Sequence, residues 1–186
     1  APDESSGTDA ILAGAAIEAV SEGTFSSSVN STALVFKTNT SAAATERFRI
    51  ASDGSLSTTT AGTSNVRFGV NAGNSIISGG NYNTVVGDEA GTAITTGDNN
   101  VAVGYAALKT EDGNGYNVAI GVGALENMNA GADAYTVAVG HNAGNDVTTG
   151  KFNNLIGGQA GDALTVGTSN IALGYQALSA DTQGDN

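Results

Sequence analysis

The sequence contains no cysteine, no tryptophan, one proline and one methionine in 186 residues. Without cysteine, the chain can form neither a disulfide nor a thiolate metal site, so its stability must come from hydrogen bonds and packing. Its only aromatic side chains are five Phe and five Tyr, which are too few to fill a thick globular core. We therefore expect a narrow interior in which small aliphatic side chains interlock.

Basic residues are also scarce, since 6 Lys and Arg stand against 18 Asp and Glu and give a formal charge of −12. This charge repels nucleic acid phosphates and anionic lipid, so neither is an expected partner. The apolar run at residues 10–20 contains Glu18 and is shorter than a membrane span, so no membrane insertion is expected. Because the chain starts without Met and stops where a further repeat would begin, we expect it to be a segment of a longer protein.

A block of five residues, typified by Asn-Val-Ala-Val-Gly, recurs seven times in the second part of the chain. Each block ends at a glycine, and the blocks begin at Asn65, Asn83, Asn100, Asn117, Thr136, Asn153 and Asn170. Successive closing glycines keep a nearly constant interval of about 17 residues, and an alanine follows each of them by three positions. A fixed period of this length predicts one small supersecondary unit stacked on copies of itself.

Within each block the second and fourth residues are mostly Val, Ile or Leu and the third is usually Ala, which indicates a short strand with two different faces. We predict that the larger residues, such as Val118 and Ile120, fill the interior of the coil. The small third residues are expected to face a neighbouring subunit; they include Ala102, Ala119, Ala138 and Ala172. A weaker strand signal lies between the blocks, at residues 92–96, 146–149 and 163–166.

The closing glycine permits a positive φ, and the opening Asn tolerates a left-handed turn and can bond the Asn of the next coil. Two strands and two turns fit one coil of this period, whereas stretches rich in Gly, Thr and Asn argue against a helical repeat. The sequence therefore predicts an all-β fold in which residues 61–186 form a β-solenoid. This parallel β-roll has seven coils of about 17 residues, each rising about 4.8 Å.

The residues before the repeats show a different pattern. Residues 33–38 and 46–50 alternate between apolar and polar side chains, and Ser52-Asp53-Gly54 is a turn signal that leads into another short strand. We predict a small β-rich module over residues 1–60.

Two parts of the sequence resemble known fibrous proteins. The block Asn117-Val-Ala-Ile-Gly121 is similar to the head repeat of trimeric autotransporter adhesins, a family of left-handed parallel β-rolls that associate as trimers. Residues 34–38 and 45–50, followed by the Asp-Gly turn, resemble a segment common in bacteriophage tail fibres, with Phe48 in place of the usual Met. The combination implies a homotrimeric phage fibre, located extracellularly in the virion.

Three sets of residues are candidates for chemistry. The segment 144–151 resembles a phosphate-binding loop, but its glycine spacing is one residue too long and Phe152 replaces the required Ser or Thr. His141 is the only histidine, so one chain has no triad or multi-histidine site, although a threefold axis could bring three copies together on an ion. Turn carboxylates are expected to bond backbone amides, with opportunistic cation binding as the alternative; they are Asp88, Asp98, Asp112, Asp133, Asp146 and Asp162. We expect no catalytic, cofactor or metal site, and no enzyme.

The function expected from these observations is that of a structural shaft segment of a trimeric phage tail fibre, which presents or contributes to host-receptor binding. The alternative is the head domain of a trimeric bacterial surface adhesin that binds host matrix or cell surface. Expected partners are two further copies of the chain, other fibre or baseplate proteins, and a host cell-surface glycan or protein. An ice-binding solenoid is disfavoured, because Val166 and Gly167 interrupt the column that contains Thr148 and Thr149.

Overall fold

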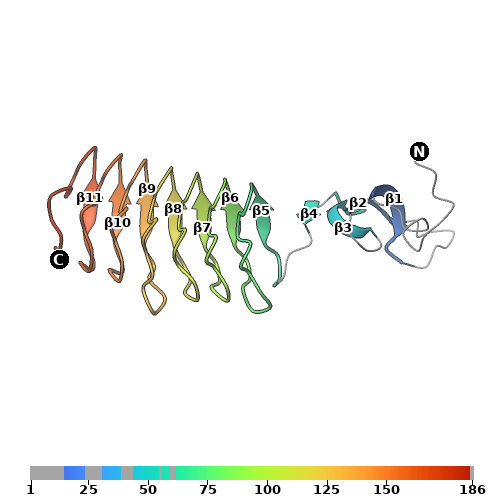
Figure 1. The fold of residues 1–186 in the computed structure, drawn as a ribbon, viewed down its shortest axis with the longest axis horizontal. Helices are drawn as coiled ribbons and strands as arrows, with labels where there is room; N and C mark the ends of the chain where they lie inside the picture. Colours follow the sequence, from blue (N-terminus) through green and yellow to red (C-terminus); the bar gives the residue numbers. More distant parts are fainter. Residues whose placement is uncertain (1–14, 24–30, 39–43, 55, 59–61, 185–186) are drawn as a thin grey trace, which may run out of the picture. The chain divides into compact units, whose positions relative to one another are not determined.

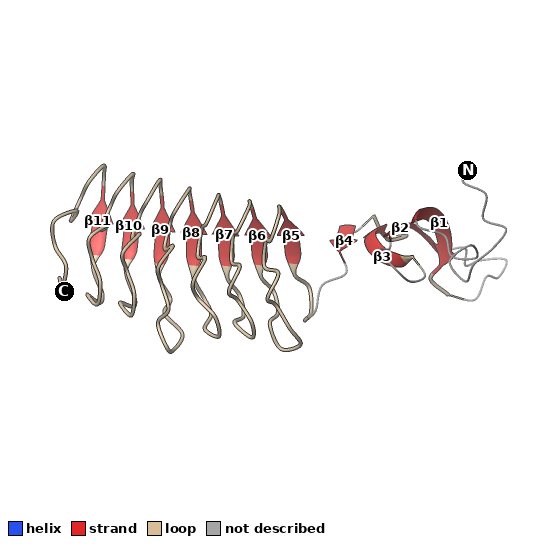
Figure 2. Cartoon of the chain, in the orientation of Figure 1, coloured by secondary structure: helices blue, strands red, loops and turns tan. Residues whose placement is uncertain are grey.

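The computed structural model contains strands and turns, with no helix among the residues it describes (Figures 1 and 2). Contacts divide the chain into two units, Ala1–Thr59 and Thr60–Asn186. The described part of the chain contains no helix long and apolar enough to cross a membrane. The predicted all-β class is therefore confirmed for the described residues, which are 15–23, 31–38, 44–54, 56–58 and 62–184.

The first unit is an antiparallel sheet with the strand order β1-β2-β3-β4. Its elements are β1 (Ala15–Ser21), β2 (Thr32–Thr38), β3 (Thr45–Ile50) and β4 (Leu56–Thr58). The two alternating segments and the turn signal at residues 52–54 are confirmed as β2, β3 and the turn into β4. The sequence pattern predicts no strand for the run at residues 10–20, yet the second half of this run enters β1.

Side chains across this sheet pair in two ways. The rings of Phe36 and Phe48 lie 5.8 Å apart on one face of the β2–β3 pair. Arg49 Nη2 lies 2.7 Å from Glu46 Oε2, and Arg49 Nη1 lies 3.2 Å from Glu22 Oε1. Of the described side chains in this unit only Ala33 and Val35 are fully buried apolar groups, so the sheet has little core of its own.

The second unit is a β-solenoid whose seven strands form one parallel sheet in reverse chain order, β11 to β5 (Figure 1). The strands are β5 (Val66–Phe68), β6 (Thr84–Val86), β7 (Val101–Val103), β8 (Val118–Ile120), β9 (Val137–Val139), β10 (Asn154–Ile156) and β11 (Ile171–Leu173). They pair in register, so that Ala102 lies beside Ala119 and Ala119 beside Ala138. The predicted solenoid is confirmed, and each strand pairs with the corresponding strand of the next repeat.

The corner after each strand requires glycine for two reasons. Gly104 has a φ of 129°, in a region that side chains other than hydrogen strongly disfavour. A methyl group on Gly104 would also lie 2.6 Å from the carbonyl oxygen of Gly121 in the next coil. The same contact recurs from coil to coil, so the closing glycine sets the distance at which coils stack.

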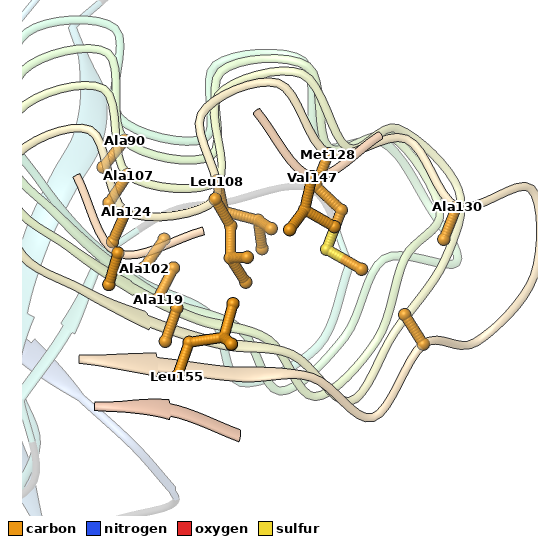
Figure 3. Packing of buried hydrophobic residues seen from close by; sticks show 14 of the residues in the cluster. Ala90, Ala102, Ala107, Leu108, Ala119, Ala124, Met128, Ala130, Val147 and Leu155 are labelled. Carbon is orange, nitrogen blue, oxygen red and sulfur yellow. The ribbon is translucent and has the colours of Figure 1, made fainter. Parts of the chain in front are cut away.

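The two faces of the strands are opposite to the prediction. The third residue of each block points into the coil, and Ala102, Ala119 and Ala138 are completely buried. The second and fourth residues lie on the outside, where Ile171 and Leu173 are 73% and 75% exposed. The physical reason is that the other walls of the coil fill the interior with large side chains, including Leu108, Leu125, Met128 and Val147, so the strand contributes small ones (Figure 3).

The size of the third residue of a block is related to the size of the fourth residue after its closing glycine, and both positions face the coil interior. The coils with Ala102 and Ala119 in the strand carry Leu108 and Leu125 at the fourth position after the closing glycine, and both leucines are fully buried. The coil with Leu155 in the strand carries Gly161 at that position, where a methyl group would lie 2.8 Å from Leu155 Cδ2. These coils therefore keep their volume by matching the two positions. The coil with Ala138 is an exception, because it carries Gly144, and Leu125 and Leu155 of the neighbouring coils reach into its space.

The segments predicted as second strands form turns instead. Residues 92–96, 146–149 and 163–166 bury one side chain each, namely Ile94, Val147 and Leu164. Their backbones still bond from coil to coil, as in the 2.8 Å bond from Thr148 N to Thr165 O. Thr148 Oγ1 also donates to that carbonyl, at 3.1 Å. One or two backbone bonds per segment, supported by a threonine hydroxyl, replace the strand ladder on this wall.

Buried asparagines connect the coils at the start of each strand. The Asn83 side-chain oxygen accepts the backbone N–H of Asn100 at 2.9 Å, and its amide nitrogen donates to Gly97 O at 2.8 Å. Asn100, Asn153 and Asn65 repeat this arrangement. The predicted link between asparagines of neighbouring coils is thus present. It joins a side-chain oxygen to a backbone amide, and between Asn153 and Asn170 it also joins the two side chains, at 3.1 Å. The left-handed residue is the one before the Asn, not the Asn itself.

The asparagine ladder has one irregular step, at Thr136. Thr136 occupies the Asn position, and its shorter side chain reaches Asn153 N at only 3.4 Å. The coil that leads from Asn117 to Thr136 is also longer than the coil from Asn83 to Asn100, and the buried amide nitrogen of Asn117 has no hydrogen-bond partner. This step is the weakest polar contact of the ladder.

Candidate functional site

The outward-facing second and fourth residues of the blocks form a continuous surface, here called the outer strand face. None of them carries a charge, and only Thr84 and Asn154 are polar. The face consists of Val66, Phe68, Thr84, Val86, Val101, Val103, Val118, Ile120, Val137, Val139, Asn154, Ile156, Ile171 and Leu173. Because the strands pair in register over all seven coils, these side chains form two mainly apolar rows along one side of the solenoid.

The exposure of this face is large for an aliphatic surface. Phe68, Ile120 and Ile156 are all exposed, in addition to the two residues of β11. A contiguous apolar surface of this kind on a soluble protein marks an interaction site.

The corner after the closing glycine extends the apolar rows at several coils. Val70, Tyr105, Val122 and Tyr175 lie there and are exposed, as predicted for this corner. His141 occupies the same position and is also exposed. The corner therefore adds apolar area beside the outer strand face, although its composition varies from coil to coil.

A second column of side chains lies at the opposite end of each strand, one residue before the buried Asn. We call it the aromatic column; its members are Ser64, Tyr82, Asn99, Tyr116, Tyr135, Phe152 and Ser169. The rings of Tyr116 and Tyr135 stack with centroids 4.8 Å apart and an interplanar angle of 11°. Phe152 continues the stack at 6.1 Å from Tyr135.

Every member of the aromatic column has a left-handed backbone, with φ between 50° and 63°. Such a conformation suits Asn and Ser but costs a bulky residue about 1–3 kcal/mol. Stacking returns about 0.5–1.5 kcal/mol per aromatic pair, which offsets part of this cost at Tyr116, Tyr135 and Phe152. Tyr82 also has a strained φ, of 58°, and it stacks on no other ring of the described residues.

Three of the six turn carboxylates accept backbone amides as predicted, whereas Asp162 Oδ1 is buried without a hydrogen-bond partner. Asp98 Oδ1 accepts Asn81 N at 2.6 Å, Asp133 Oδ1 accepts Gly115 N at 2.9 Å, and Asp112 Oδ1 accepts Gly113 N. The first two bonds connect neighbouring coils, so these carboxylates support the stack. Lys109 Nζ lies 2.6 Å from Glu89 Oε2, and this hydrogen bond raises the pKa of Lys109.

The described residues contain no group of three or more His, Cys, Asp or Glu side chains that could hold a metal ion. Within one chain, His141 lies alone on its corner. The segment 144–151 is an ordinary part of a coil, in which Gly144 adopts a positive φ of 60° and Val147 is buried. The structure brings none of these candidates together into a site.

Sequence reasoning missed the aromatic column and reversed the outer strand face. A signal for the column was present, because an aromatic residue precedes the block at Tyr82, Tyr116, Tyr135 and Phe152. The reversed face had a weaker signal in the alternation of Leu and Gly four positions after the closing glycine. Comparison with known proteins adds no further guide, since no family model, no curated protein and no solved structure matches the chain.

Proposed function

We propose that this chain is a structural shaft segment of a homotrimeric phage tail fibre, which presents or contributes to host-receptor binding. The observation that supports this proposal most directly is the outer strand face. Burying one side chain the size of Ile or Leu contributes about 1.5–3 kcal/mol. A row of them along the solenoid provides enough driving force for stable association with an identical row.

A trimer fits the shape of this face better than an open assembly. Three copies around a common axis parallel to the stack would each turn their apolar rows inward and close the assembly. The head repeats of trimeric autotransporter adhesins, which the block resembles, belong to trimers as well. We propose that the second and fourth residues of each block form the subunit interface. The third residue, for which the sequence pattern predicts this role, lies in the coil interior.

The linear architecture supports the shaft role. A stack of near-identical coils forms a rod that can hold its two ends apart. Its strands present uniform surfaces with few polar groups from which a catalytic site could be built. In a virion, such a segment would hold a receptor-binding tip away from the particle and connect to other fibre or baseplate proteins. The resemblance of residues 34–50 to tail fibre segments favours this setting over the head of a bacterial adhesin.

The oligomeric state can be tested with two matched lysine substitutions. Ile120→Lys places a charge on the outer strand face, whereas Thr149→Lys adds the same charge on the wall of turns, where Thr149 is exposed. Light scattering should give a trimer for the parent chain and for Thr149→Lys, and a monomer for Ile120→Lys with an unchanged circular dichroism spectrum. A parent chain that is monomeric at micromolar concentration would refute the trimer.

The viral setting needs a separate experiment. Antibodies raised against the solenoid should label the tail appendages of phage particles in electron micrographs. Labelling of a bacterial cell surface in the absence of phage would favour the adhesin head instead.

A further inference from the structure

The aromatic column is interrupted at one place, where Asn99 lies between Tyr82 and Tyr116. Backbone bonds fix all three residues in one column: Tyr82 N donates to Thr63 O at 2.9 Å, Asn99 N to Asn81 O at 3.0 Å and Tyr116 N to Asp98 O at 3.0 Å. Tyr82 and Tyr116 are therefore two coils apart, with one exposed amide side chain between them. We call this interval the Tyr82–Tyr116 gap.

The size of the gap follows from the filled part of the same column. Adjacent coils place Tyr116 and Tyr135 at a centroid distance of 4.8 Å, equal to the rise of about 4.8 Å between paired strands. Two coils separate the rings of the gap, so a six-membered ring inserted at the middle would lie about one stacking distance from each. The gap has the dimensions of one missing ring.

The rings on both sides of the gap have surfaces available for contact. Tyr82 is 58% exposed and Tyr116 is 44% exposed. Tyr116 stacks on Tyr135 with one face only, so its other face is directed toward the coil of Asn99. The amide of Asn99 supplies one acceptor and two donors at the base of the gap, and the two phenol hydroxyls supply further polar groups at its sides.

From this arrangement we infer that the Tyr82–Tyr116 gap binds a single ring of a neutral sugar, held between two tyrosine faces. A pyranose ring has apolar C–H groups on its faces, which suit the two aromatic surfaces, and hydroxyls around its edge, which suit the Asn99 amide. The formal charge of −12 on the chain disfavours nucleotides, sulfated glycans and other anions. The inferred ligand class is therefore an uncharged glycan.

This inference goes beyond the shaft role and rests on the receptor-binding part of the proposed function, for which it names a site and a ligand class. One gap that holds one sugar ring gives a weak site, with a dissociation constant on the order of 1–10 mM. Several chains in one appendage would present several such sites to the same polysaccharide, which increases the apparent affinity without any new contact. The site would then retain the fibre on a glycan-covered surface.

The test uses four neutral methyl glycosides, of glucose, galactose, mannose and N-acetylglucosamine, with the complete chain. Saturation-transfer NMR should detect binding of at least one glycoside at about 20 mM, and a titration should give a millimolar dissociation constant. Tyr82→Ser removes one wall; Ser64 and Ser169 show that serine accepts the left-handed backbone in this column. Asn99→Tyr fills the gap with a ring of the protein itself. Both variants should weaken binding at least about tenfold.

A matched variant distinguishes the gap from a general loss of aromatic surface. Tyr135→Asn removes one tyrosine but opens a second interval, between Tyr116 and Phe152, so binding should persist with up to twice the number of sites. Absence of binding to all four glycosides would overturn the inference, as would unchanged binding in Asn99→Tyr. A loss of trimer mass in Tyr82→Ser or Asn99→Tyr, without any glycoside binding to the parent, would assign the gap to a neighbouring subunit and also overturn it. The shaft proposal is judged separately, by the mass of the parent and of Ile120→Lys.

Discussion

The two units of this chain are both all-β, yet they are stabilised in different ways. Strands β1 and β2 have seven residues each and β3 has six, but among the described side chains their sheet fully buries only Ala33 and Val35 as apolar groups. The solenoid strands have three residues each, and behind them lies a continuous core from Ala72 to Ala172. Strand length is therefore a poor measure of stability here.

The difference arises from what each backbone segment contacts. In the antiparallel sheet, each strand contributes paired side chains and surface ion pairs, and an exposed ion pair is worth only about 0–1 kcal/mol. In the solenoid, each coil contacts the next along its whole perimeter, through the strand, the glycine corner and the asparagine ladder. Stacking gives every residue of a coil an equivalent neighbour, and the resulting contacts add along the chain.

The largest expected effect comes from changing the length of the stack. Deleting residues 101–117 joins Asn100 to Val118, the same step that Asn117 makes now, so every strand and corner keeps its place and a shorter solenoid should fold. Deleting residues 101–108 joins Asn100 to Lys109 and places turn residues where a strand belongs, so this variant should not fold. Circular dichroism and thermal melting measure both, and identical behaviour of the two deletions would contradict the solenoid.

A charge placed inside a coil should be nearly as damaging. Ala119→Glu buries a carboxylate at a completely buried position, which should cost roughly 4 kcal/mol or more of unfolding free energy. The matched change Ile17→Glu in β1, where Ile17 is 69% exposed, should change stability by no more than about 0.5 kcal/mol. Urea unfolding of both variants provides the comparison, and a well-folded monomeric Ala119→Glu chain would return this residue to a subunit interface.

The exchange of large and small residues can be tested by a swap. Leu155→Ala should cost about 2–4 kcal/mol by leaving a cavity. Gly161→Leu alone should cost about 1–3 kcal/mol by overpacking, in addition to the strain of a side chain at its φ of 60°, a conformation that Leu108 also adopts at 50°. The double variant recreates the pairing of Ala102 with Leu108 and should unfold within about 1–2 kcal/mol of the parent. Additive losses in the double variant would show that these positions do not share one volume.

Repair of the irregular ladder step should give a smaller, stabilising change. Thr136→Asn lengthens the side chain toward Asn153 N, which Thr136 Oγ1 now reaches at 3.4 Å. By analogy with Asn153, whose amide donates to Gly167 O at 2.9 Å, the new amide would donate to Gly150 O. We expect a gain of about 0.5–1.5 kcal/mol, measured by chemical unfolding. Thr84→Asn, on the outer strand face, is the control and should give no such gain.

The smallest expected effect is a difference between the two units in how acid changes their stability. Hydrogen bonds from Ser52, and then from Arg49, lower the pKa of Glu22, and Arg49 likewise lowers the pKa of Glu46. A lowered folded-state pKa stabilises the sheet above the ordinary glutamate value of 4.5, and this contribution is lost as the pH falls below that value. Hydrogen exchange followed into this range should therefore increase in β1–β3 before it increases in the solenoid. In Arg49→Met, β1–β3 should lose the part of this difference that comes from Glu46, whereas the Ser52 bonds to Glu22 remain.

The sequence was sufficient to predict the coil and its period, because the glycine corner imposes a contact that repeats at every turn and leaves a visible repeat. It was not sufficient to orient the strand. A strand of alternating Val and Ala is compatible with either face inward, and the choice depends on Leu108, Leu125 and Met128, which lie on other walls of the coil. The aromatic column was missed because Ser and Asn occupy some of its positions. All of its members share a left-handed backbone, which cannot be recognised from their residue types.

The direction of the hydrogen bonds between coils has a mechanical consequence. Because the strands lie across the stack and pair edge to edge, these bonds run along the direction in which a load would pull. Tension would peel one coil away from the next instead of shearing many bonds together. Each freed coil would release about 17 residues, a length of roughly 60 Å when extended, in place of a rise of about 4.8 Å. A single solenoid under tension would therefore lengthen in steps, one coil at a time. Solenoids associated side by side could lengthen only if the corresponding coils of all copies detached together.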